Sequence, residues 1–344
     1  MTGPAIQYRV LDAIAPEAEL ALVRALLTGA EAGPDGPPLL TVARLAGEGI
    51  ALGAHQRAAT ALASPHPEPV LRRLSGGRVS RYGAGQVSVC LIVPDIHALT
   101  GAFTVDRVIN RAVRGVLKAL NALGLNALYG GRDVATVTRR PVALLGMEGR
   151  VDGVSLFQAV IGLERVAAPE PGWVAVPPPA GMGGAPWAAL SELRPGLTFG
   201  ALADALLKGY ADATGRDLAA APGPAPDGLP APASADGGHA WSAPLPVPIG
   251  LLEAGVTLDG GALADVALRG DFITTSAALD ALAAALRGLP PERDAVGRAV
   301  DRVFAADAPH GIMGLTSLAV IRDAVLDAAG RYRKMEACAH GGGM

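Results

Sequence analysis

Arginine and glycine residues concentrate between positions 72 and 86, and their types suit the binding of a ligand. The segment begins Arg72-Arg73-Leu74-Ser75-Gly76-Gly77-Arg78 and ends Gly83-Ala84-Gly85-Gln86. Paired glycines allow positive φ and let a backbone come close to a ligand, and a guanidinium can meet a phosphate or a carboxylate. The ligand-binding residues predicted from this segment are Arg73, Ser75, Gly76, Gly77, Arg78, Gly85 and Gln86.

A purely structural turn is the alternative explanation of these glycines. A Walker-type phosphate loop is excluded, because no Gly-Lys-Ser or Gly-Lys-Thr follows the glycines and no helix is expected to begin there. The surrounding elements must therefore decide between a ligand loop and a turn.

Few other side chains offer nucleophilic or metal-binding chemistry. The two cysteines, Cys90 and Cys338, have neither the spacing of a disulfide framework nor that of metal ligands, so no metal site is predicted. Cys90 lies in an apolar run and is expected to be a buried, unreactive thiol. Cys338 and His340 lie in a tail expected to be unstructured, which is a poor place for a preorganised nucleophile. His55 follows a predicted turn, and we expect it on a surface loop, with a ligand pocket as the alternative.

Hydrophobic periodicity predicts the elements that hold these residues. Residues 15–28, and the stretch from Thr104 or Asp106 to about Leu123, have apolar positions at helical spacing. Residues 87–93 form a nearly continuous apolar run, which is typical of a strand buried on both faces. Further strands are expected within 37–52, 133–137, 142–145, 154–163, 255–258 and 264–268, and further helices at 198–210, 276–286, 295–305 and 315–331.

Length and composition indicate two domains with a sizeable core. The chain has 344 residues, of which 50% are hydrophobic, and a net charge of −3. This charge gives no electrostatic argument for binding nucleic acid or a membrane surface. No apolar run approaches the ~20 residues of a membrane helix, and the first residues do not have the pattern of a secretory signal. We therefore expect a cytoplasmic protein.

Several segments, in the same order along the chain, carry a resemblance to one superfamily. They are residues 50–56, 72–77, 83–86, 120–124, 130–133 and 191–215. Through them, residues 15–215 resemble the catalytic domain of the lipoate–protein ligases and lipoyl(octanoyl) transferases. Residues 253–305 resemble, more weakly, the small accessory domain of the ligases.

The resemblance implies a fold class and a division of the chain. The fold is expected to be α+β, with a mixed β-sheet flanked by helices as in the biotin and lipoate ligases, followed by a small α/β accessory domain. The expected boundaries are 1–217 for the catalytic-type domain, 218–247 for an Ala/Pro/Gly-rich linker, 248–332 for the accessory domain and 333–344 for a flexible tail.

The same resemblance implies a function in protein lipoylation. An active member would bind lipoate or octanoate, use ATP and Mg²⁺ to form an acyl-adenylate, and pass the acyl group to a lysine of a lipoyl-carrier domain. Such carriers are of the 2-oxoacid dehydrogenase or glycine-cleavage type. The accessory domain favours the ligase branch over the transferase branch. Asp133 is expected either to face the ligand, by analogy with the family, or to be a turn residue.

Four positions depart from the residues with which the superfamily performs its chemistry. The family's cysteine nucleophile falls on Ala180, and two of its histidines fall on Tyr82 and Phe157. Its lysine falls on Pro141, or on Arg140 if the register is shifted by one residue. Proline has no side-chain donor and no backbone N–H, and an alanine methyl cannot attack a carbonyl.

A relocated arginine is the one replacement that the sequence offers for the missing lysine. Arg139 is expected on the same strand face as position 141, and it or Arg140 could supply a positive charge, although arginine does not reproduce the geometry of lysine. Three hypotheses follow: a working ligase that uses Arg139 or Arg140, an inactive homologue that binds an acyl ligand or a lipoyl-carrier domain, and a scaffold that uses the fold only for protein contacts.

Overall fold

The computed structural model describes residues 4–33, 35–66, 69–96, 105–149, 153–177, 180–222, 238–305 and 310–341. Its first part contains β1 (Ile6–Ile14), α1 (Pro16–Ala32), β2 (Leu39–Leu45), β3 (Ile50–Leu52), α2 (Ala58–Ala61), β4 (Val70–Arg72), β5 (Ser80–Arg81), β6 (Gln86–Val93), α4 (Val105–Ala122), β7 (Ala127–Tyr129), β8 (Val134–Val137), β9 (Arg140–Gly149), β10 (Ser155–Gly162), the 3₁₀ turns η1 (Pro171–Trp173) and η2 (Met182–Gly184), α5 (Leu190–Leu193), α6 (Phe199–Thr214) and β11 (Leu218–Ala220). Its second part contains β12 (Ala240–Trp241), β13 (Leu245–Val247), β14 (Gly250–Asp259), β15 (Ala262–Gly270), α7 (Ser276–Leu286), α8 (Arg293–Phe304) and α9 (Ala319–Gly341).

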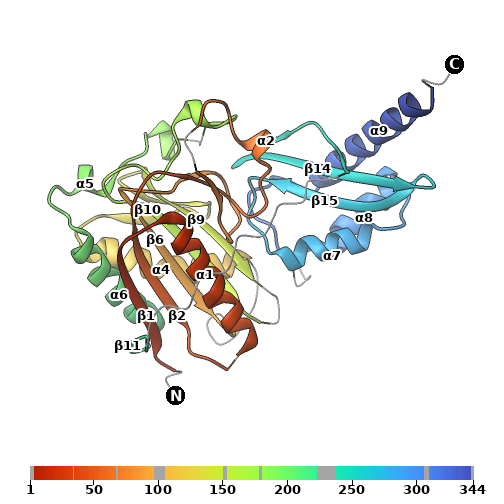
Figure 1. The fold of residues 1–344 in the computed structure, drawn as a ribbon. Coiled ribbons are helices and arrows are strands. Elements are labelled where there is room, and N and C mark those ends of the chain that lie inside the picture. Colours follow the sequence, from red (N-terminus) through yellow and green to blue (C-terminus); the bar gives the residue numbers. More distant parts are fainter. Residues whose placement is uncertain are drawn as a thin grey trace.

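A large mixed sheet forms the body of the first part, as the sequence predicted. Its strand order is β11-β1-β2-β6-β10-β9-β8-β7. The pairs β1–β2 and β1–β11 are parallel, and the remaining pairs are antiparallel. Figure 1 shows α1 on one face of this sheet and α4 with α6 on the other. The expected α+β class, with a mixed sheet between helices, is confirmed.

Alternation along β6 explains why the sheet is covered on both faces. All eight of its residues are buried. Val87, Val89 and Leu91 belong to the core under α4, whereas Cys90 and Ile92 pack against α1. Successive side chains of a strand point to opposite faces, so an almost continuous apolar run requires a helix layer on each side. The expected buried strand and buried Cys90 are therefore confirmed.

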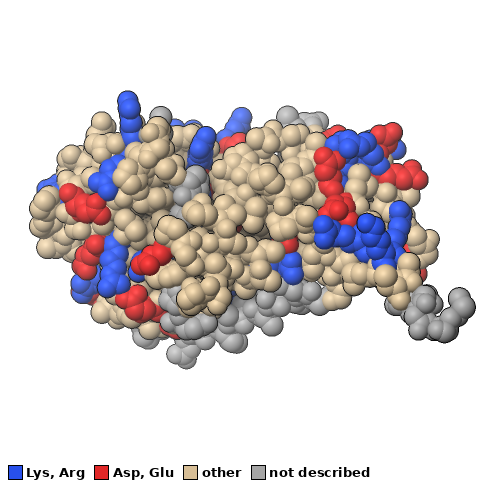
Figure 2. Space-filling view, turned by 90° about the horizontal axis from the view of Figure 1, so that it is seen from above, with Lys and Arg blue, Asp and Glu red and all other residues tan. Residues whose placement is uncertain are grey.

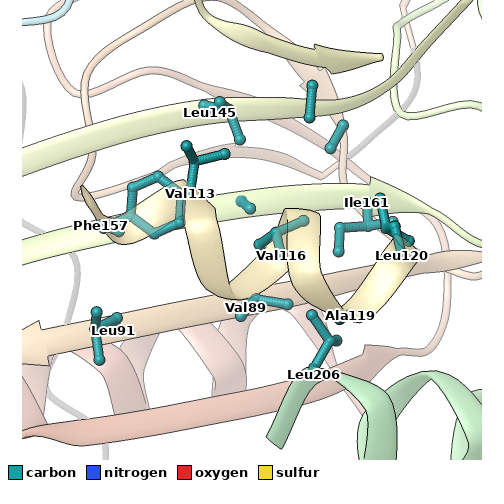
Figure 3. Close-up of a cluster of buried hydrophobic side chains, with 14 of the residues drawn as sticks. Val89, Leu91, Val113, Val116, Ala119, Leu120, Leu145, Phe157, Ile161 and Leu206 are labelled. Atoms are coloured by element: carbon teal, nitrogen blue, oxygen red, sulfur yellow. The ribbon is translucent and has the colours of Figure 1, made fainter. Parts of the chain in front are cut away.

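The main core lies between the sheet and α4. Figure 3 shows Val113 and Val116 of α4 among side chains of the neighbouring strands, including Leu145 and Phe157. Behind α4, helix α6 crosses so closely that a Cβ placed on Gly209 would lie 2.3 Å from the carbonyl oxygen of Gly115. Glycine at this crossing lets the two backbones approach each other.

This crossing gives a matched pair of substitutions within α6. Gly209→Ala is expected to lower the free energy of unfolding by about 1–3 kcal/mol, because the added methyl overpacks the crossing. Gly200→Ala, in the same helix with no atom within 4 Å of its Cβ position, is expected to raise it by about 0.4–1 kcal/mol through helix propensity and chain entropy. Urea unfolding of both variants measures these values, and a gain in stability for Gly209→Ala would contradict the close crossing.

The second part has its own antiparallel sheet and its own core. Strand β14 pairs with β12, β13 and β15, and α7, α8 and α9 cover one side of this sheet. Buried residues of these elements, among them Leu252, Phe272, Leu282, Val300 and Ile321, form one hydrophobic cluster. Figure 1 shows this accessory part beside the end of the large sheet, with α9 extending away from it.

One expectation about the chain's course is corrected, and one strand was missed. The predicted linker, residues 218–247, is ordered at both ends, because β11 pairs with β1, and β12 and β13 pair with β14; residues 223–237 lie outside the described part. The two strands expected in 37–52 belong to different sheets, since β2 joins the large sheet and β3 pairs with β4 and β5. Strand β1 was not predicted at all.

The expected flexible tail, residues 333–344, is helical as far as Gly341, where the description ends. The stretch Met335-Glu336-Ala337-Cys338-Ala339 consists mainly of good helix formers and contains neither proline nor glycine. Helix α9 therefore continues past the accessory core. Cys338 is exposed on it.

No described helix is long and apolar enough to cross a membrane. On the face shown in Figure 2, basic and acidic side chains lie intermixed, with a broad uncharged surface between them.

Candidate functional site

The glycine pair of the predicted ligand loop is enclosed between the large sheet and the accessory part. The Gly76 N–H donates to the carbonyl oxygen of Met147 on β9 at 2.9 Å, and the Gly77 N–H donates to that of Phe272 at 2.9 Å. A Cβ placed on Gly146 would lie 2.3 Å from the Gly76 oxygen, so the loop rests directly on β9. Both backbone donors that could hold a ligand are engaged by the protein itself.

Arg73 and Ser75 also turn inward. Arg73 is 1% exposed, and its Nη2 donates to the carbonyl oxygen of Arg78 at 2.6 Å. Burial lowers the pKa of Arg73 to about 10. The Ser75 hydroxyl donates to the Oε1 of Gln158 on β10 at 2.6 Å. Ser75 therefore fastens the loop to β10, whereas Arg73 braces the loop from within, and its buried Nε and Nη1 have no hydrogen-bond partner among the described residues.

Two of the predicted ligand-binding residues, Arg78 and Asp133, form an ion pair with each other. Nε and Nη2 of Arg78 donate to the two carboxylate oxygens of Asp133, and Arg78 is 6% exposed while Asp133 is fully buried. A bidentate pair of this kind is strong and geometrically specific. The structure thus brings together a loop arginine and an aspartate 55 residues away, and each neutralises the other.

A buried polar network lies under the loop and contains Tyr82, one of the altered positions. The Tyr82 hydroxyl donates to Glu19 of α1, and the Nε2 of Gln158 donates to the Tyr82 oxygen at 3.0 Å. Ser88 lies 3.1 Å from the same hydroxyl. Burial raises the pKa values of Glu19 and Tyr82, and it raises that of the neighbouring Cys90 well above its ordinary value. This network is suited to holding the loop, and it keeps Cys90 in the unreactive thiol form.

The remaining predicted residues lie apart from the glycine pair. Gly85 packs against Arg165, and the Gln86 side chain accepts from the Gly83 N–H and donates to the Arg165 carbonyl. Phe157 is 1% exposed in the core under α4. These three residues therefore have structural surroundings, with no contact to Gly76 or Gly77 among the described residues.

The strand that should begin with the family's lysine contains no lysine at any register. Strand β9 has the sequence RPVALLGMEG, so the absence does not depend on how the family pattern is aligned. Thr138 and Arg139 have φ of 48° and 71°, which places Arg139 in the turn before β9 and corrects the expectation that it lies on the strand. Arg140 donates to the Trp187 carbonyl and to Glu192, both at 2.9 Å.

Two altered positions lie close together at this end of β9. Pro141 is buried, and a Cβ placed on Gly181 would lie 2.7 Å from the Cδ of Pro141. Ala180, the neighbour of Gly181, is exposed. Pro141 and Gly181, the neighbour of Ala180, thus lie close together, and the side chains of Pro141 and Ala180 have no polar atom.

All three lysines of the sequence lie elsewhere. Lys118, Lys208 and Lys334 are exposed on α4, α6 and α9, and Lys208 pairs with Asp212 at 2.8 Å. Arginine cannot take over proton transfer from a lysine, because it stays protonated. No lysine is therefore placed to stabilise an acyl group beside the loop.

Polar contacts between the two parts of the chain were missed by the sequence analysis. The Nε2 of Gln56 donates to Asp271, and Arg57 and Thr60 contact Glu253 at 2.7 and 2.5 Å. His55 is 4% exposed and stacks on Phe272 with ring centroids 5.6 Å apart. His55 therefore lies neither on a surface loop nor in a pocket, because the accessory part covers it.

A second contact joins β9 to the start of α7. Glu148 accepts from the N–H of Ser276 at 2.7 Å and from its hydroxyl at 2.8 Å. Burial raises the pKa of Glu148 to about 7 and that of Asp271 to about 6, while it lowers that of His55 to about 4. Glu148 and Asp271, two of the groups that hold the accessory part over the loop, thus have pKa values raised toward neutral pH. Local sequence patterns cannot predict such contacts, since Gln56 and Asp271, for example, are 215 residues apart.

Whether ATP and Mg²⁺ fit this arrangement depends on which N–H donors and carboxylates are available to bind them. The N–H groups of Gly76 and Gly77 already have carbonyl partners, and the Asp133 carboxylate is neutralised by Arg78. Among the described residues, no group of three or more His, Cys, Asp or Glu side chains could hold a metal ion. In this arrangement the two glycine N–H groups and the Asp133 carboxylate are therefore not available to a nucleotide phosphate and its cation.

Comparisons with known proteins identify the architecture. No protein-family model matches the sequence, and no curated protein matches it either. Among solved structures, LipL1 of P. falciparum in complex with lipoate aligns with a TM-score of 0.60 at 15% identity, covering 93% of this chain and 99% of that chain.

A second solved structure aligns with a smaller part of this chain. It belongs to the bipartite lipoate protein ligase of Thermoplasma acidophilum, studied together with its E2 lipoyl domain. It aligns with a TM-score of 0.52 at 16% identity, covering 63% of this chain and 87% of that chain. The mixed sheet, its helix layers and the accessory part together therefore have the fold of the lipoate–protein ligases.

Proposed function

We propose that this protein binds a lipoyl-carrier domain and its acyl group without catalysing ATP-dependent acyl transfer. Two facts support a role in the lipoylation system: LipL1, which shares the fold over almost the whole chain, was solved in complex with lipoate, and the Thermoplasma acidophilum ligase was studied with its E2 lipoyl domain. The lipoyl carrier would be of the 2-oxoacid dehydrogenase or glycine-cleavage type.

One observation supports the absence of acyl-transfer catalysis. The Gly76 and Gly77 N–H groups already have carbonyl partners, the Asp133 carboxylate is held by Arg78, and β9 has no lysine. Removing a single donor that stabilises developing charge typically slows a reaction by about 10²–10³. Here the donors beside the loop and the lysine are missing together.

The test combines carrier binding with carrier modification. The purified protein is mixed with an apo lipoyl domain, lipoate, ATP and Mg²⁺, and the carrier is weighed by intact mass spectrometry while binding is followed by calorimetry. We expect measurable heat of binding and no gain of a lipoyl group on the carrier. Binding absent with both apo and lipoylated carriers would overturn the proposal, and so would stoichiometric lipoylation.

A working ligase is the second candidate, and the match to LipL1 over 93% of this chain favours it. It would act in the cytoplasm on lipoate or octanoate with ATP and Mg²⁺, and Arg140 would have to leave Glu192 to supply charge. In that case the carrier gains the mass of the acyl group, and Arg140→Ala abolishes the gain while Arg139→Ala tests the turn residue separately.

A further inference from the structure

A cavity of about 460 Å³ lies between the two parts of the chain, away from the enclosed glycine pair. It is lined by α4, by the turn between β7 and β8, and by residues 248–249 and 312–315 of the accessory part. Sites for small molecules commonly measure about 300–1,000 Å³ and occur between domains. Its size and position therefore suit a small ligand.

One wall of this cavity is apolar. It is formed by Tyr129 of β7 and by Ile249, Ile312, Met313 and Leu315. The backbone of Met313 is fixed by paired hydrogen bonds with Ile273, at 2.9 and 3.0 Å, so the wall is held in place from the accessory side. A hydrocarbon chain placed against these side chains would leave water for an apolar surface.

The opposite rim is polar but has no net charge. Asp106 and Asn110 lie one turn apart on α4, and Arg132 lies on the turn after β7. Their side chains are exposed, and the single positive charge of Arg132 balances the single negative charge of Asp106. Asp133, which also borders the cavity, is already paired with Arg78. A free carboxylate therefore gains no net electrostatic attraction at this rim.

Neutral hydrogen-bonding groups are available at the same place. The Asn110 amide offers both a donor and an acceptor, and the Tyr129 hydroxyl has the Met313 sulfur, 3.9 Å away, as its partner among the described residues. A thioether is a weak acceptor, so this hydroxyl can exchange it for a better one. Burial raises the pKa of Tyr129, so the group is a neutral donor.

We propose that this cavity binds an apolar acyl chain that ends in a neutral amide, the chemistry of an acylated lysine side chain. The chain lies against Tyr129, Ile312 and Leu315, and the amide meets Asn110 and the Tyr129 hydroxyl. The exposed rim leaves a path by which an acyl-lysine that belongs to another protein can enter. This inference rests on the proposed function and narrows it, because it assigns recognition to the acylated form of the carrier.

The direct test compares two probes that differ only in their head group. Octanamide and octanoate are titrated into the full-length protein by calorimetry at pH 8. We expect octanamide to bind at least tenfold more tightly than octanoate. Equal or tighter binding of octanoate would overturn the amide assignment, and binding of neither probe would overturn the site.

Two variants on α4 and one in the accessory part test where octanamide binds. Asn110 is exposed, so Asn110→Ala should leave the protein folded while it weakens octanamide binding at least fivefold. Lys118→Ala, two turns further along α4 on an exposed position, should leave it unchanged. Leu315→Trp, which fills the cavity, should abolish binding. Unchanged octanamide binding in both Asn110→Ala and Leu315→Trp would place the ligand elsewhere and contradict the proposal.

Binding measurements with the lipoylated and the apo carrier domain distinguish this inference from the proposed function. The lipoylated lipoyl domain is expected to bind at least tenfold more tightly than the apo domain, and Leu315→Trp should remove the difference. Equal binding of the two forms would overturn the cavity assignment while leaving carrier binding intact. Loss of binding with both forms would instead overturn the proposed function.

Discussion

Asp133→Ala is expected to lower the free energy of unfolding by about 3–5 kcal/mol, because it leaves the buried Arg78 guanidinium without its partner. Arg78 is 6% exposed and Asp133 is fully buried, so water cannot replace the lost carboxylate. For a unit the size of the first part of the chain, which carries Asp133, each kcal/mol lowers the melting temperature by roughly 2–4 °C, and the total drop should be about 6–20 °C. Thermal and urea unfolding of the purified variant measure both quantities.

Two controls separate a lost ion pair from a general defect. The double variant Arg78→Met with Asp133→Leu removes both charges and should recover most of the loss, since apolar replacements of a buried pair are often neutral. Asp12→Ala breaks the exposed pair with Arg44 and should cost less than about 1 kcal/mol. If Asp133→Ala unfolds like the wild type but no longer binds a ligand, Asp133 faces that ligand and the structural account of the pair is wrong.

Glu148→Gln is expected to stabilise the protein at pH 8 by about 2–3 kcal/mol and to change nothing at pH 4. Burial raises the pKa of Glu148 from 4.5 to about 7, so the folded state holds its proton more tightly than the unfolded chain does. A group of this kind stabilises the fold fully below pH 4.5, and the contribution is lost as the pH rises to about 7. Glutamine stays neutral: its amide oxygen can accept from the Ser276 N–H, and its amide nitrogen can donate to the Ser276 hydroxyl oxygen, which then acts as the acceptor.

Neighbouring groups set the shape of the pH profile. Asp271, with its pKa raised to about 6, should act in the same direction as Glu148. His55 acts in the opposite direction, because a pKa lowered to about 4 makes stability fall as the pH drops below about 6.5. Difference curves between wild type and Glu148→Gln isolate the glutamate from both.

Glu192→Gln is a control for which the opposite change in stability at pH 8 is expected. The Ala189 N–H and Arg140 lower the pKa of Glu192, so this carboxylate stabilises the fold above its unfolded pKa, and its replacement should destabilise the protein at pH 8. A Glu148→Gln variant that is less stable than the wild type at pH 8 would show that the charged carboxylate is favoured at the start of α7.

Local patterns in the sequence were sufficient to predict the scaffold. The run at 87–93 required cover on both faces, and the helical spacing at 109, 112, 116 and 120 identified the helix that supplies it on one side. Strand β1 was missed, because its residues are only partly buried and give little alternation. The helical tail was missed because a polar, exposed helix has no apolar stripe to reveal it.

The contacts that surround the loop could not be predicted from the sequence. Arg73, Ser75 and Arg78 have the types of ligand-binding residues, and the glycines have the freedom to approach a ligand. Their partners are Gln158, Asp133 and Phe272, which come from a distant strand, the start of a hairpin and the accessory part. Only the tertiary arrangement shows which partners these residues have inside the protein, because the same residue types serve a ligand site and a buried contact equally well.

The central claim is that the loop which would cradle an acyl-adenylate serves instead as a structural contact. Lipoate-dependent exchange of labelled pyrophosphate into ATP measures the adenylation step directly, without a carrier. With Mg²⁺ and saturating lipoate or octanoate, the account predicts no exchange above a control without the acid. Exchange at a rate typical of an enzyme, and its loss in Arg140→Ala, would contradict the account and show that the loop opens and a relocated arginine restores catalysis.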